Sequence, residues 1–466
     1  MIKFGTGGWR AIIADEFTRE NIRLLAQSLV SEVDDKKIVI GYDRRFLSDI
    51  AAQWLAEVFA GNGIKVYFIN KEVPTPMIMF AIKKMGLNYG LAVTASHNPA
   101  IYNGVKIFTH GGRDATEDIT QKLESNLENL GEVKAIDFDK AIDEGLIVYY
   151  MPQNEYIDSI LAFVDPEIIR KSNLKVLVDT MHGVSKTSLS IILNTLRVDV
   201  DIINDRHDTL FGGKLPSPAS STLHKLSDMV KESNYDMGIA TDGDADRIGI
   251  IDELGNFVHP NILISLIYYY LLEYKNWKGG AVRNLSTTHL IDKIAEDHGE
   301  ICLETPVGFK HITSGMESID ALIGGESSGG LTIRGHINGK DGIFAATLLV
   351  EMISFTGKSI GNLVDELYDR YGKLYNQERD YRFSVEKKES IRELLFSNLE
   401  LPKFNLEIST VSYLDGVKVV MNDGSWVSAR FSGTEPLLRI FSEANSQKDS
   451  IQLVEAFESF LNIKPQ

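Results

Sequence analysis

The chain has 466 residues, and at roughly 100–200 residues per domain this length predicts three or four domains. Hydrophobic residues make up 44% and charged residues 24%, which is ordinary globular usage and excludes a chain that is mostly disordered. The formal net charge is −17, from 48 basic and 65 acidic residues; it argues against nonspecific nucleic-acid binding, so a small anionic ligand would need a local basic cluster.

The first 150 residues alternate helical and strand patterns. Thr18 is a candidate N-cap for a helix that repeats apolar residues from Ile22 to Val30. Apolar runs at 37–43, 64–70 and 90–94 predict buried strands. Strands that alternate with helices predict parallel βαβ units, in which ligands collect at the carboxyl ends of the strands.

The strand pattern restarts further along the chain and changes near the end. Further strands are predicted at 174–180, 198–204, 236–240, 279–285 and 320–325. The last hundred residues differ: they predict a hairpin (416–421 and 426–431), a strand (437–444) and an amphipathic helix (448–462). We therefore expect three consecutive α/β domains with mainly parallel, mixed sheets and a smaller α+β domain. The predicted boundaries are 1–152, 153–255, 256–370 and 371–466.

The loop TASHNP (94–99) follows the strand at 90–94. Its Ser96 fits an ordinary turn, in which serine and asparagine bond to the backbone, or a nucleophile. A hydrolase triad is disfavoured because the sequence has no G-x-S-x-G elbow here. We also expect the side chains of Ser96 and His97 to diverge, as neighbours do in an extended turn, so that His97 is a positioning or turn residue rather than a base.

The loop TDGDADRIG (241–249) places three aspartates within five residues after a strand. Asp242, Asp244 and Asp246 repel one another unless a cation neutralises them, which favours metal binding over bare surface charge. An EF-hand is an alternative, with Glu253 at its twelfth position, but the required glycine is replaced by Arg247. A phosphatase-like loop with Asp242 as nucleophile is another. Oxygen ligands with few protein donors suit Mg²⁺.

Two further loops contain groups that could bind a ligand. In GGESSGG (324–330), glycines around Glu326 and Ser328 allow close backbone approach, and a carboxylate with a hydroxyl could bind vicinal sugar hydroxyls; a plain linker is the alternative. In RFSGTEP (430–436), Arg430 and the neighbouring hydroxyls and amides could surround a phosphate; an ordinary turn between strands is the alternative.

Taken together, these loops resemble those of the α-D-phosphohexomutase family. The resemblance covers the whole chain, with one loop in each predicted domain, in the family's order. The segments that carry it are TASHNP, DGDADR, GGESSGG, SGTEP, FGTGGWR (4–10), GYDRR (41–45), NGVKIF (103–108) and TPVGFK (305–310).

The resemblance implies that Ser96 carries a phosphoryl group, passes it to a sugar phosphate, and receives it back after the bisphosphorylated sugar has turned over in a cleft between the domains. It implies Mg²⁺ on Asp242, Asp244 and Asp246, in contact with the phosphate on Ser96. The residues it implies for the substrate are Glu326 and Ser328 for the sugar hydroxyls, Lys310 for the phosphate or the sugar, and Arg430, Ser432, Gly433 and Thr434 for the non-reacting phosphate.

The proton-transfer group is less clearly marked by the resemblance. Lys106 matches a family lysine near the reacting hydroxyl, and Arg10 and Arg247 match arginines that organise the site. Some branches of the family carry a histidine base at the end of the third loop, where this chain has Gly330, and this departure moves the expectation to Lys106. His336 lies nearby in sequence, and we expect it to be an ordinary core or surface histidine.

The sequence therefore predicts a Mg²⁺-dependent phosphohexomutase of the phosphoglucomutase type, with glucose 1,6-bisphosphate as activating phosphate donor. A phosphomannomutase or a dual-specificity enzyme is the alternative, and a catalytically silent sugar-phosphate or Ca²⁺-binding protein is a remote one. Hexose phosphates are the expected partners, with no nucleic acid and no membrane, in a monomer or weak homodimer. The single cysteine, Cys302, excludes an intrachain disulfide and fits a cytoplasmic location.

Overall fold

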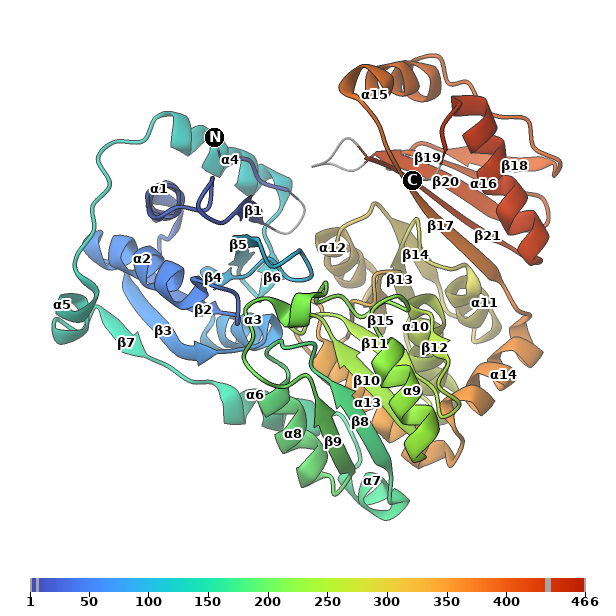
Figure 1. Ribbon diagram of the computed structural model, residues 1–466, viewed down its shortest axis with the longest axis horizontal. Coiled ribbons are helices and arrows are strands. Elements are labelled where there is room, and N and C mark those ends of the chain that lie inside the picture. The colour runs from blue at the N-terminus through green and yellow to red at the C-terminus, as the bar shows by residue number, and fades with distance from the viewer. Residues whose placement is uncertain (1, 6–7, 432–436, 465–466) are drawn as a thin grey trace.

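The computed structural model describes residues 2–5, 8–431 and 437–464. Domains I, II and III each contain a mixed sheet flanked by helices, and domain IV contains an antiparallel sheet. In Figure 1, domain I and domain IV form two arms on either side of domains II and III. This arrangement confirms the predicted fold class.

Domain I has a seven-stranded sheet with the order β1-β5-β4-β2-β3-β7, and β6 pairs with β5. The pairs β2–β3, β2–β4 and β3–β7 are parallel, whereas β5 is antiparallel to β1 and β4. The strands are β1 (Trp9–Ile12), β2 (Lys37–Tyr42), β3 (Lys65–Glu72), β4 (Tyr89–Val93), β5 (Tyr102–Thr109), β6 (Arg113–Asp114) and β7 (Ile147–Tyr149). The helices are α1 (Arg19–Leu29), η1 (Val30–Glu32), α2 (Ser48–Gly61), α3 (Thr75–Met85), α4 (Glu117–Glu128) and α5 (Phe138–Asp143).

Neighbouring residues of β2 show how the sheet of domain I is covered on both faces. Ile38 and Ile40 pack into a core with α1 and α2, while Val39 packs on the other side with residues of α3. Parallel strands that are buried on both faces read as continuous apolar runs, which is why the sequence predicted them. Thr18 caps α1 as expected, since its side chain accepts a hydrogen bond from the amide of Asn21.

Domain II has a five-stranded sheet with the order β12-β11-β10-β8-β9. Strand β8 is parallel to β9 and β10, whereas β11 is antiparallel to β10. The elements are α6 (Gln153–Leu161), α7 (Pro166–Ser172), β8 (Lys175–Asp179), α8 (Lys186–Thr195), β9 (Asp199–Ile203), η2 (Phe211–Gly213), α9 (His224–Ser233), β10 (Met237–Thr241), β11 (Ile248–Ile251) and β12 (Phe257–Val258). The loop between β10 and β11 is the three-aspartate loop.

Domain III has a four-stranded sheet with the order β14-β13-β15-β16. Strand β13 is parallel to β14 and β15, and β16 runs antiparallel to β15. The elements are α10 (Pro260–Tyr269), η3 (Tyr270–Tyr274), β13 (Ala281–Asn284), α11 (Leu290–Asp297), β14 (Cys302–Thr305), α12 (Phe309–Ile319), β15 (Ile323–Gly325), β16 (Leu331–Ile333), α13 (Gly342–Thr356) and α14 (Ile360–Tyr371).

Domain IV has an antiparallel five-stranded sheet with the order β17-β21-β20-β19-β18. The elements are β17 (Tyr375–Arg382), α15 (Val385–Arg392), η4 (Glu393–Ser397), β18 (Ile408–Ser412), β19 (Val417–Met421), β20 (Trp426–Phe431), β21 (Leu437–Ala444) and α16 (Gln447–Leu461). The predicted hairpin is the β19–β20 pair, and the predicted C-terminal helix is α16.

The apolar core is divided unevenly among the domains. One continuous core contains residues of domains I, II and III, such as Ile78, Ile239 and Phe344. Domain IV has a separate core that includes Val419 and Phe457. The α/β domains are therefore joined by shared apolar packing, which in the described part of the chain does not extend into domain IV.

A group of polar side chains, here named the interdomain cluster, joins domain IV to domain III and is buried at Arg283 and Lys418. It consists of Arg283, His289, Glu304 and Lys418. The ammonium of Lys418 donates to the carbonyl of Leu285 (3.0 Å), to His289 Nε2 (2.9 Å) and to Glu304, and Arg283 donates to the same carboxylate. The two domains thus meet through hydrogen bonds and ion pairs.

No single described helix is both long and apolar enough to cross a membrane. Only α13 and α14 taken together pass such a test by length and composition, and they are bent by 80° relative to each other. Helix α13 is buried inside the protein along most of its length.

Candidate functional site

The serine loop and the aspartate loop meet where two strands end. Ser96 follows β4 in domain I, and the aspartate loop follows β10 in domain II. The hydroxyl of Ser96 donates a hydrogen bond of 2.7 Å to Asp242 Oδ2 across 146 residues of sequence. Both side chains are buried, with Ser96 only 1% exposed. The structure therefore brings the predicted nucleophile into direct contact with the predicted metal loop.

The backbone of Ser96 corrects one expectation. Its φ of 51° lies in the left-handed region, which a residue other than glycine adopts at a cost. The extended turn assumed from the sequence is therefore wrong, and the side chains do not diverge, since His97 Nδ1 lies 3.3 Å from Ser96 Oγ. The guanidinium of Arg247, burial and Arg10 hold the pKa of His97 well below its ordinary value, so this imidazole is neutral.

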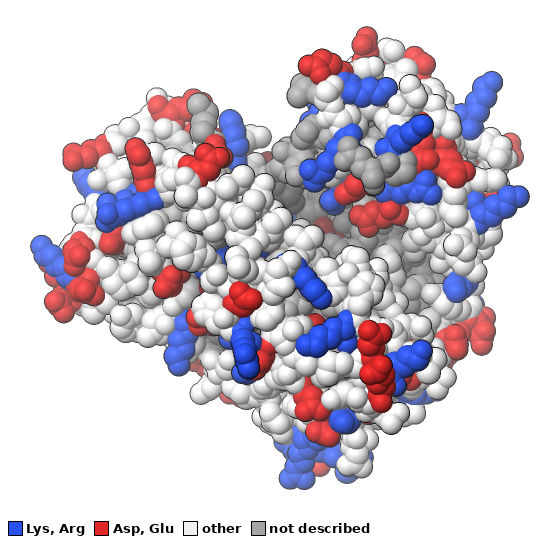
Figure 2. All heavy atoms as spheres, viewed as in Figure 1, with Lys and Arg blue, Asp and Glu red and all other residues white. Residues whose placement is uncertain are grey.

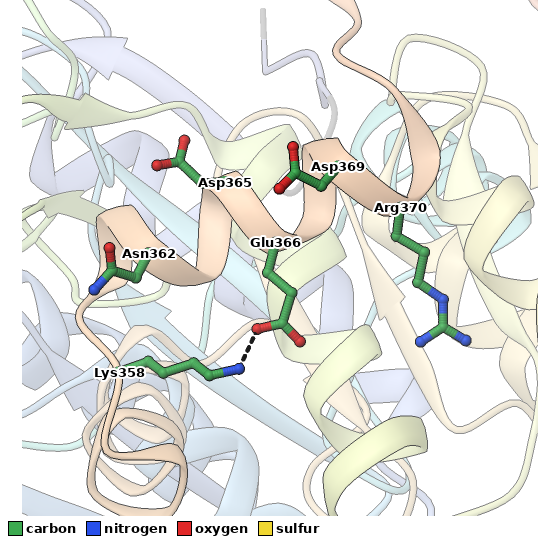
Figure 3. Close-up of a pocket in the computed structure, with 6 residues that line it drawn as sticks. All are labelled: Lys358, Asn362, Asp365, Glu366, Asp369 and Arg370. Carbon is green, nitrogen blue, oxygen red and sulfur yellow. Dashed lines mark hydrogen bonds and ion pairs between the residues drawn. The ribbon is translucent and has the colours of Figure 1, made fainter.

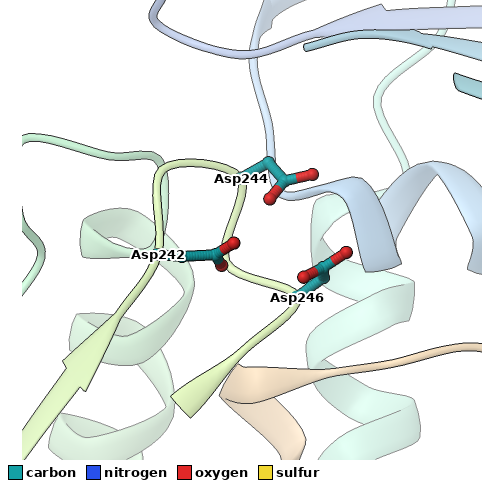
Figure 4. A group of neighbouring side chains, drawn as sticks. All are labelled: Asp242, Asp244 and Asp246. Carbon is teal, nitrogen blue, oxygen red and sulfur yellow. The ribbon is translucent and has the colours of Figure 1, made fainter. Parts of the chain in front are cut away.

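Asp242, Asp244 and Asp246, here named the aspartate cluster, lie together in the loop between β10 and β11 (Figure 4). All three are buried, and one carboxylate oxygen from each lies within 4.8 Å of the others. The EF-hand interpretation is wrong: strands flank the loop, and Glu253 instead accepts hydrogen bonds from Ser359 and the amide of Gly361 at the start of α14.

The donor set of the aspartate cluster fits a divalent cation. Asp244 Oδ1 and Asp246 Oδ1 are buried and have no hydrogen-bond partner among the described residues. A buried carboxylate oxygen without a partner is strongly unfavourable, and a hard cation with oxygen ligands removes that penalty. Burial, together with Asp244 and Asp246, raises the pKa of Asp242 well above its ordinary value, which also shows how much negative charge is concentrated here.

Two lysines lie against the aspartate cluster. Lys106, on β5, donates to Asp244 Oδ2 and Asp246 Oδ2, each at 2.7 Å. Burial alone would lower the pKa of Lys106, but these two carboxylates reverse the effect and raise it. In this arrangement Lys106 is protonated, so the base role expected from the resemblance requires that the two ion pairs first be broken.

The second lysine, Lys340, was missed by the sequence analysis. Its Nζ lies 3.2 Å from Asp246 Oδ2. Its side chain fills the space beside Gly330, where an added Cβ would lie 2.2 Å from Lys340 Cδ. This chain has no histidine at Gly330. The side chain of Lys340, from the turn before α13, occupies the space beside that position instead. Nothing in the local sequence distinguishes this lysine from the others.

Arg10 and Arg247 add positive charge to the same site. The amide of Arg247 donates to Asp242 Oδ1 (3.1 Å), and its Nε lies 3.9 Å from Asp246 Oδ1. Arg10, on β1, has its pKa lowered by burial and by the neighbouring Arg247. The Nε atoms of both guanidinium groups are buried and have no hydrogen-bond partner within the described part of the chain. Unpartnered cationic donors of this kind fit an anionic ligand.

The third loop is fixed by its glutamate. Glu326 is buried, and its Oε1 accepts hydrogen bonds from the amide of Gly308 (3.1 Å) and from Asn284 Nδ2 (3.3 Å). Ser328 is exposed, and its hydroxyl lies 3.4 Å from Glu326 Oε2. Lys310 forms an ion pair with Glu117 of α4, so the segment TPVGFK also contacts domain I.

The fourth loop is described only in part. Arg430, near the end of β20, donates to Asp415 Oδ2 at 2.7 Å, and the same oxygen accepts a hydrogen bond from the amide of Val307 in domain III. Ser432, Gly433 and Thr434 lie outside the described residues. Figure 2 shows a hollow in the surface between the arms formed by domains I and IV, with basic and acidic side chains together on the domain IV side.

Comparison with known proteins covers nearly the whole chain. Models of phosphoglucomutase/phosphomannomutase α/β/α domains I, II and III and of the C-terminal domain match residues 1–134, 154–255, 259–371 and 396–459. A phosphoglucomutase/phosphomannomutase from Thermococcus kodakarensis is 31% identical over 462 residues, covering 97% of this chain and 96% of the relative.

Two further relatives extend the comparison. A protein named as a probable phosphoglucosamine mutase from Pyrococcus furiosus is 31% identical over 453 residues, covering 97% of this chain and 96% of the relative. A crystal structure of a candidate phosphomannomutase from Thermus thermophilus is 29% identical, has a TM-score of 0.86 and covers 99% of both chains. The names of these relatives span more than one sugar.

Proposed function

We propose that this chain, which belongs to the phosphoglucomutase/phosphomannomutase family of phosphohexomutases, interconverts glucose 1-phosphate and glucose 6-phosphate. The observation that most directly supports the phosphohexomutase chemistry is the hydrogen bond of 2.7 Å between Ser96 Oγ and Asp242, in a buried site that also holds basic side chains. The choice of glucose rests on the segments GGESSGG (324–330) and TPVGFK (305–310), which resemble the glucose branch of the family. A phosphomannomutase or dual-specificity enzyme is the alternative.

The proposed reaction has two phosphoryl transfers. The phosphoryl group leaves Ser96 Oγ, which takes up a proton, for a hydroxyl oxygen of the sugar phosphate, whose own proton passes to a basic group of the site. The bisphosphorylated sugar then turns over, and its other phosphoryl group moves to Ser96 Oγ. In this second transfer the serine gives its proton to the basic group and the sugar oxygen takes one up, which gives the isomeric monophosphate. Glucose 1,6-bisphosphate would load the serine at the start, because it is the same intermediate supplied from solution.

The side chains divide this work by position. Asp242, Asp244 and Asp246 would hold Mg²⁺, which neutralises charge on the transferring phosphoryl group when it is bound. The guanidinium groups of Arg10 and Arg247, whose Nε atoms are buried without a hydrogen-bond partner among the described residues, would attract and orient the reacting phosphate. Separation of the site from water protects the phosphoserine from hydrolysis.

We propose that the far end of the substrate is bound by domains III and IV. Glu326 and Ser328 would contact sugar hydroxyls, with Lys310 nearby. Arg430, Ser432, Gly433 and Thr434 would hold the non-reacting phosphate, so that its binding energy positions the other end of the sugar. We retain the division 1–152, 153–255, 256–370 and 371–466 as the proposed boundaries of the four domains.

Lys106 and Lys340 are the two amines that could carry the proton. Both contact the aspartate cluster, and a cation bound there would compete with them for the same carboxylates. An amine released in this way becomes more acidic beside a metal and two guanidinium groups. Lys340 fills the position beside Gly330, which makes it the stronger candidate where other branches of the family use a histidine.

Intact-mass measurement tests the phosphoserine step. After incubation with glucose 1,6-bisphosphate and Mg²⁺, the wild-type chain should gain the mass of one phosphoryl group, and Ser96→Ala should gain none. A wild-type protein that gains no mass and has no mutase activity, or a Ser96→Ala variant phosphorylated equally well, would overturn the mechanism.

Substrate competition tests the choice of sugar. We expect kcat/KM for glucose 1-phosphate to exceed the values for mannose 1-phosphate and glucosamine 1-phosphate by about tenfold, because a single hydrogen bond to the group at C2 contributes up to about that factor. A hundredfold preference for either of the other sugars would replace glucose in this proposal while leaving the phosphohexomutase chemistry intact.

A further inference from the structure

Arg45 lies directly behind the serine loop. It follows β2, whose neighbour in the sheet is β4, and the parallel pair places Tyr42 beside Val93. The carboxyl ends of the two strands therefore meet, and the side chain of Arg45 runs from one loop into the other. Arg45 is 3% exposed, so it acts inside the protein rather than at the surface of the cleft.

The guanidinium of Arg45 donates hydrogen bonds to four backbone carbonyls of the short segment 96–102. Its Nη2 donates to the carbonyls of Ser96 (2.6 Å) and Asn98 (2.7 Å). Its Nη1 donates to the carbonyls of Pro99 and Tyr102, each at 3.0 Å. A planar group with fixed N–H directions can satisfy four convergent acceptors, whereas a lysine ammonium has only three donors.

These bonds account for the backbone conformation of Ser96. Carbonyls that all turn toward one cation curl the segment, and Ser96 adopts its left-handed φ of 51° within that curl. The carbonyl oxygen of Ser96 also lies close to Gly243 of domain II, where an added Cβ would be only 2.8 Å away. With this carbonyl bound by Arg45, the hydroxyl of Ser96 faces Asp242.

The guanidinium is itself held by neighbouring groups. The ring of Phe211, from domain II, lies 4.8 Å from its central carbon. Its Nε lies 3.5 Å from Asp43 Oδ2, and that carboxylate is fixed by hydrogen bonds from Thr94 (2.6 Å) and Ser48 (2.8 Å). Arg45 thus links the position of the serine loop to the positions of Phe211 in domain II and of Asp43 just after β2.

We propose that Arg45 is a positioning residue for the phosphoryl-carrying serine: by binding the carbonyls of residues 96, 98, 99 and 102 it holds Ser96 Oγ in line with the aspartate cluster. The proposal rests on the proposed function, since it concerns the efficiency of transfer through Ser96. Because Arg45 is buried behind the serine loop, we expect it to act on turnover rather than on substrate binding.

Arg45→Lys is the decisive variant, because it keeps the positive charge but loses the planar guanidinium that binds four carbonyls at once. A displacement of the reacting oxygen by about 1 Å lowers turnover on the order of 100-fold, so we expect kcat to fall by about that factor while KM for glucose 1-phosphate stays within about threefold. Phosphorylation of Ser96 by glucose 1,6-bisphosphate, followed by intact mass, should slow by a similar factor.

Arg44→Lys is the matched control. Arg44 is the preceding residue and donates to the carbonyl of Asp205 in domain II, so it shares the junction but not the serine loop. Its kcat should stay within about twofold of wild type. An equal loss of kcat in both variants would show that the junction as a whole is responsible, and would overturn the specific role of Arg45.

A wild-type kcat in Arg45→Lys, or a raised KM with unchanged kcat, would also overturn the proposal. If Arg45→Lys fails to fold, Phe211→Leu loosens the guanidinium from its other face, and it should lower kcat about fivefold at constant KM; an unchanged kcat would contradict the proposal. Failure of the proposed function is distinct from all of these, because the wild-type protein itself would then neither be phosphorylated nor interconvert hexose phosphates.

Discussion

The aspartate cluster and the interdomain cluster both bury a lysine against carboxylates, but they differ in how many polar atoms have partners. In the interdomain cluster, all three N–H donors of Lys418 are used, and Glu304 binds Arg283 as well. In the aspartate cluster, two carboxylate oxygens have no hydrogen-bond partner among the described residues. The first arrangement is closed, and the second leaves room for a further cation.

The pKa values of the two lysines follow from the same difference. Lys106 meets two carboxylates, which raise its pKa in spite of burial. For Lys418, burial and the nearby Arg283 outweigh the attraction of Glu304 and lower the pKa to about 8. A buried lysine therefore takes its behaviour from the local balance of charge. An excess of unpaired carboxylate indicates a reactive site, and a saturated network indicates a structural one.

Asp244→Asn should give the largest effect. It removes a proposed metal ligand, so turnover should fall about 1,000-fold or more, the loss typical of a group that stabilises the transition state. Stability should change much less than turnover, because the asparagine carbonyl can still accept the hydrogen bonds from Lys106 and Thr75, and Lys106 keeps its ion pair with Asp246. Steady-state kinetics and thermal unfolding measure the two effects, and the Mg²⁺-dependent rise in Tm of the wild type should disappear. Near-normal turnover would place the metal elsewhere.

Lys418→Met tests the interdomain cluster. The methionine retains the apolar contacts of the stem but removes the ammonium from Glu304, and breaking a buried pair should lower the free energy of unfolding by about 3 kcal/mol. Urea denaturation measures this loss. Lys403→Met, at an exposed position of the same domain, is the control and should be nearly neutral. Equal stabilities for the two variants would show that the interdomain cluster contributes nothing.

The pH dependence of stability sharpens the comparison. The pKa of Lys418 is lowered to about 8 in the folded protein, so between pH 8 and its unfolded value the unfolded chain holds the proton that the folded chain has released. The free energy of unfolding should therefore rise between pH 8 and 9.5, by about 1–2 kcal/mol, and this gain is lost as the pH falls to 8. Lys418→Met should lack the rise; an identical slope would assign it to other groups.

Lys358→Ala should give the smallest effect. Figure 3 shows Lys358, which lies just before α14, beside acidic side chains of that helix. Together they line a pocket of about 630 Å³. The ion pair of Lys358 with Glu366 is exposed, and exposed pairs contribute less than about 1 kcal/mol. We expect unchanged kcat and a change in unfolding free energy within about 0.5 kcal/mol. A larger loss would mean that the contrast between buried and exposed pairs does not hold here.

Much of the fold could be predicted because its strands are continuous apolar runs that end in polar loops. The strands at 37–43, 174–180 and 236–240 appear as β2, β8 and β10, displaced by no more than one residue. Strands such as β14 and β17 were missed, since neither is a fully buried apolar run, and β17 lies on an edge of its sheet. Burial is not sufficient for detection either, since β5 and β11 are buried along most or all of their length and were also missed.

The site was predictable only where a loop carries its own chemistry. Three aspartates in one loop indicate a metal by their mutual repulsion, and they lie together as expected. Arg45 and Lys340 could not be assigned in this way, because each reaches the site from an element distant in sequence. The proximity of Ser96 and His97 depends on one backbone angle, which no residue pattern specifies.

The uneven division of the apolar core sets how many cooperative units the molecule has. Domains I, II and III share one continuous core, so loss of any one of them exposes the packing of the others, and we expect them to unfold as a single foldon. Domain IV has its own core and contacts domain III through the polar interdomain cluster, so we expect it to form a second unfolding unit. We therefore expect the four domains to unfold as two cooperative units. Damage to domain IV would then remove one end of the proposed cleft while Ser96 and the aspartate cluster stay folded.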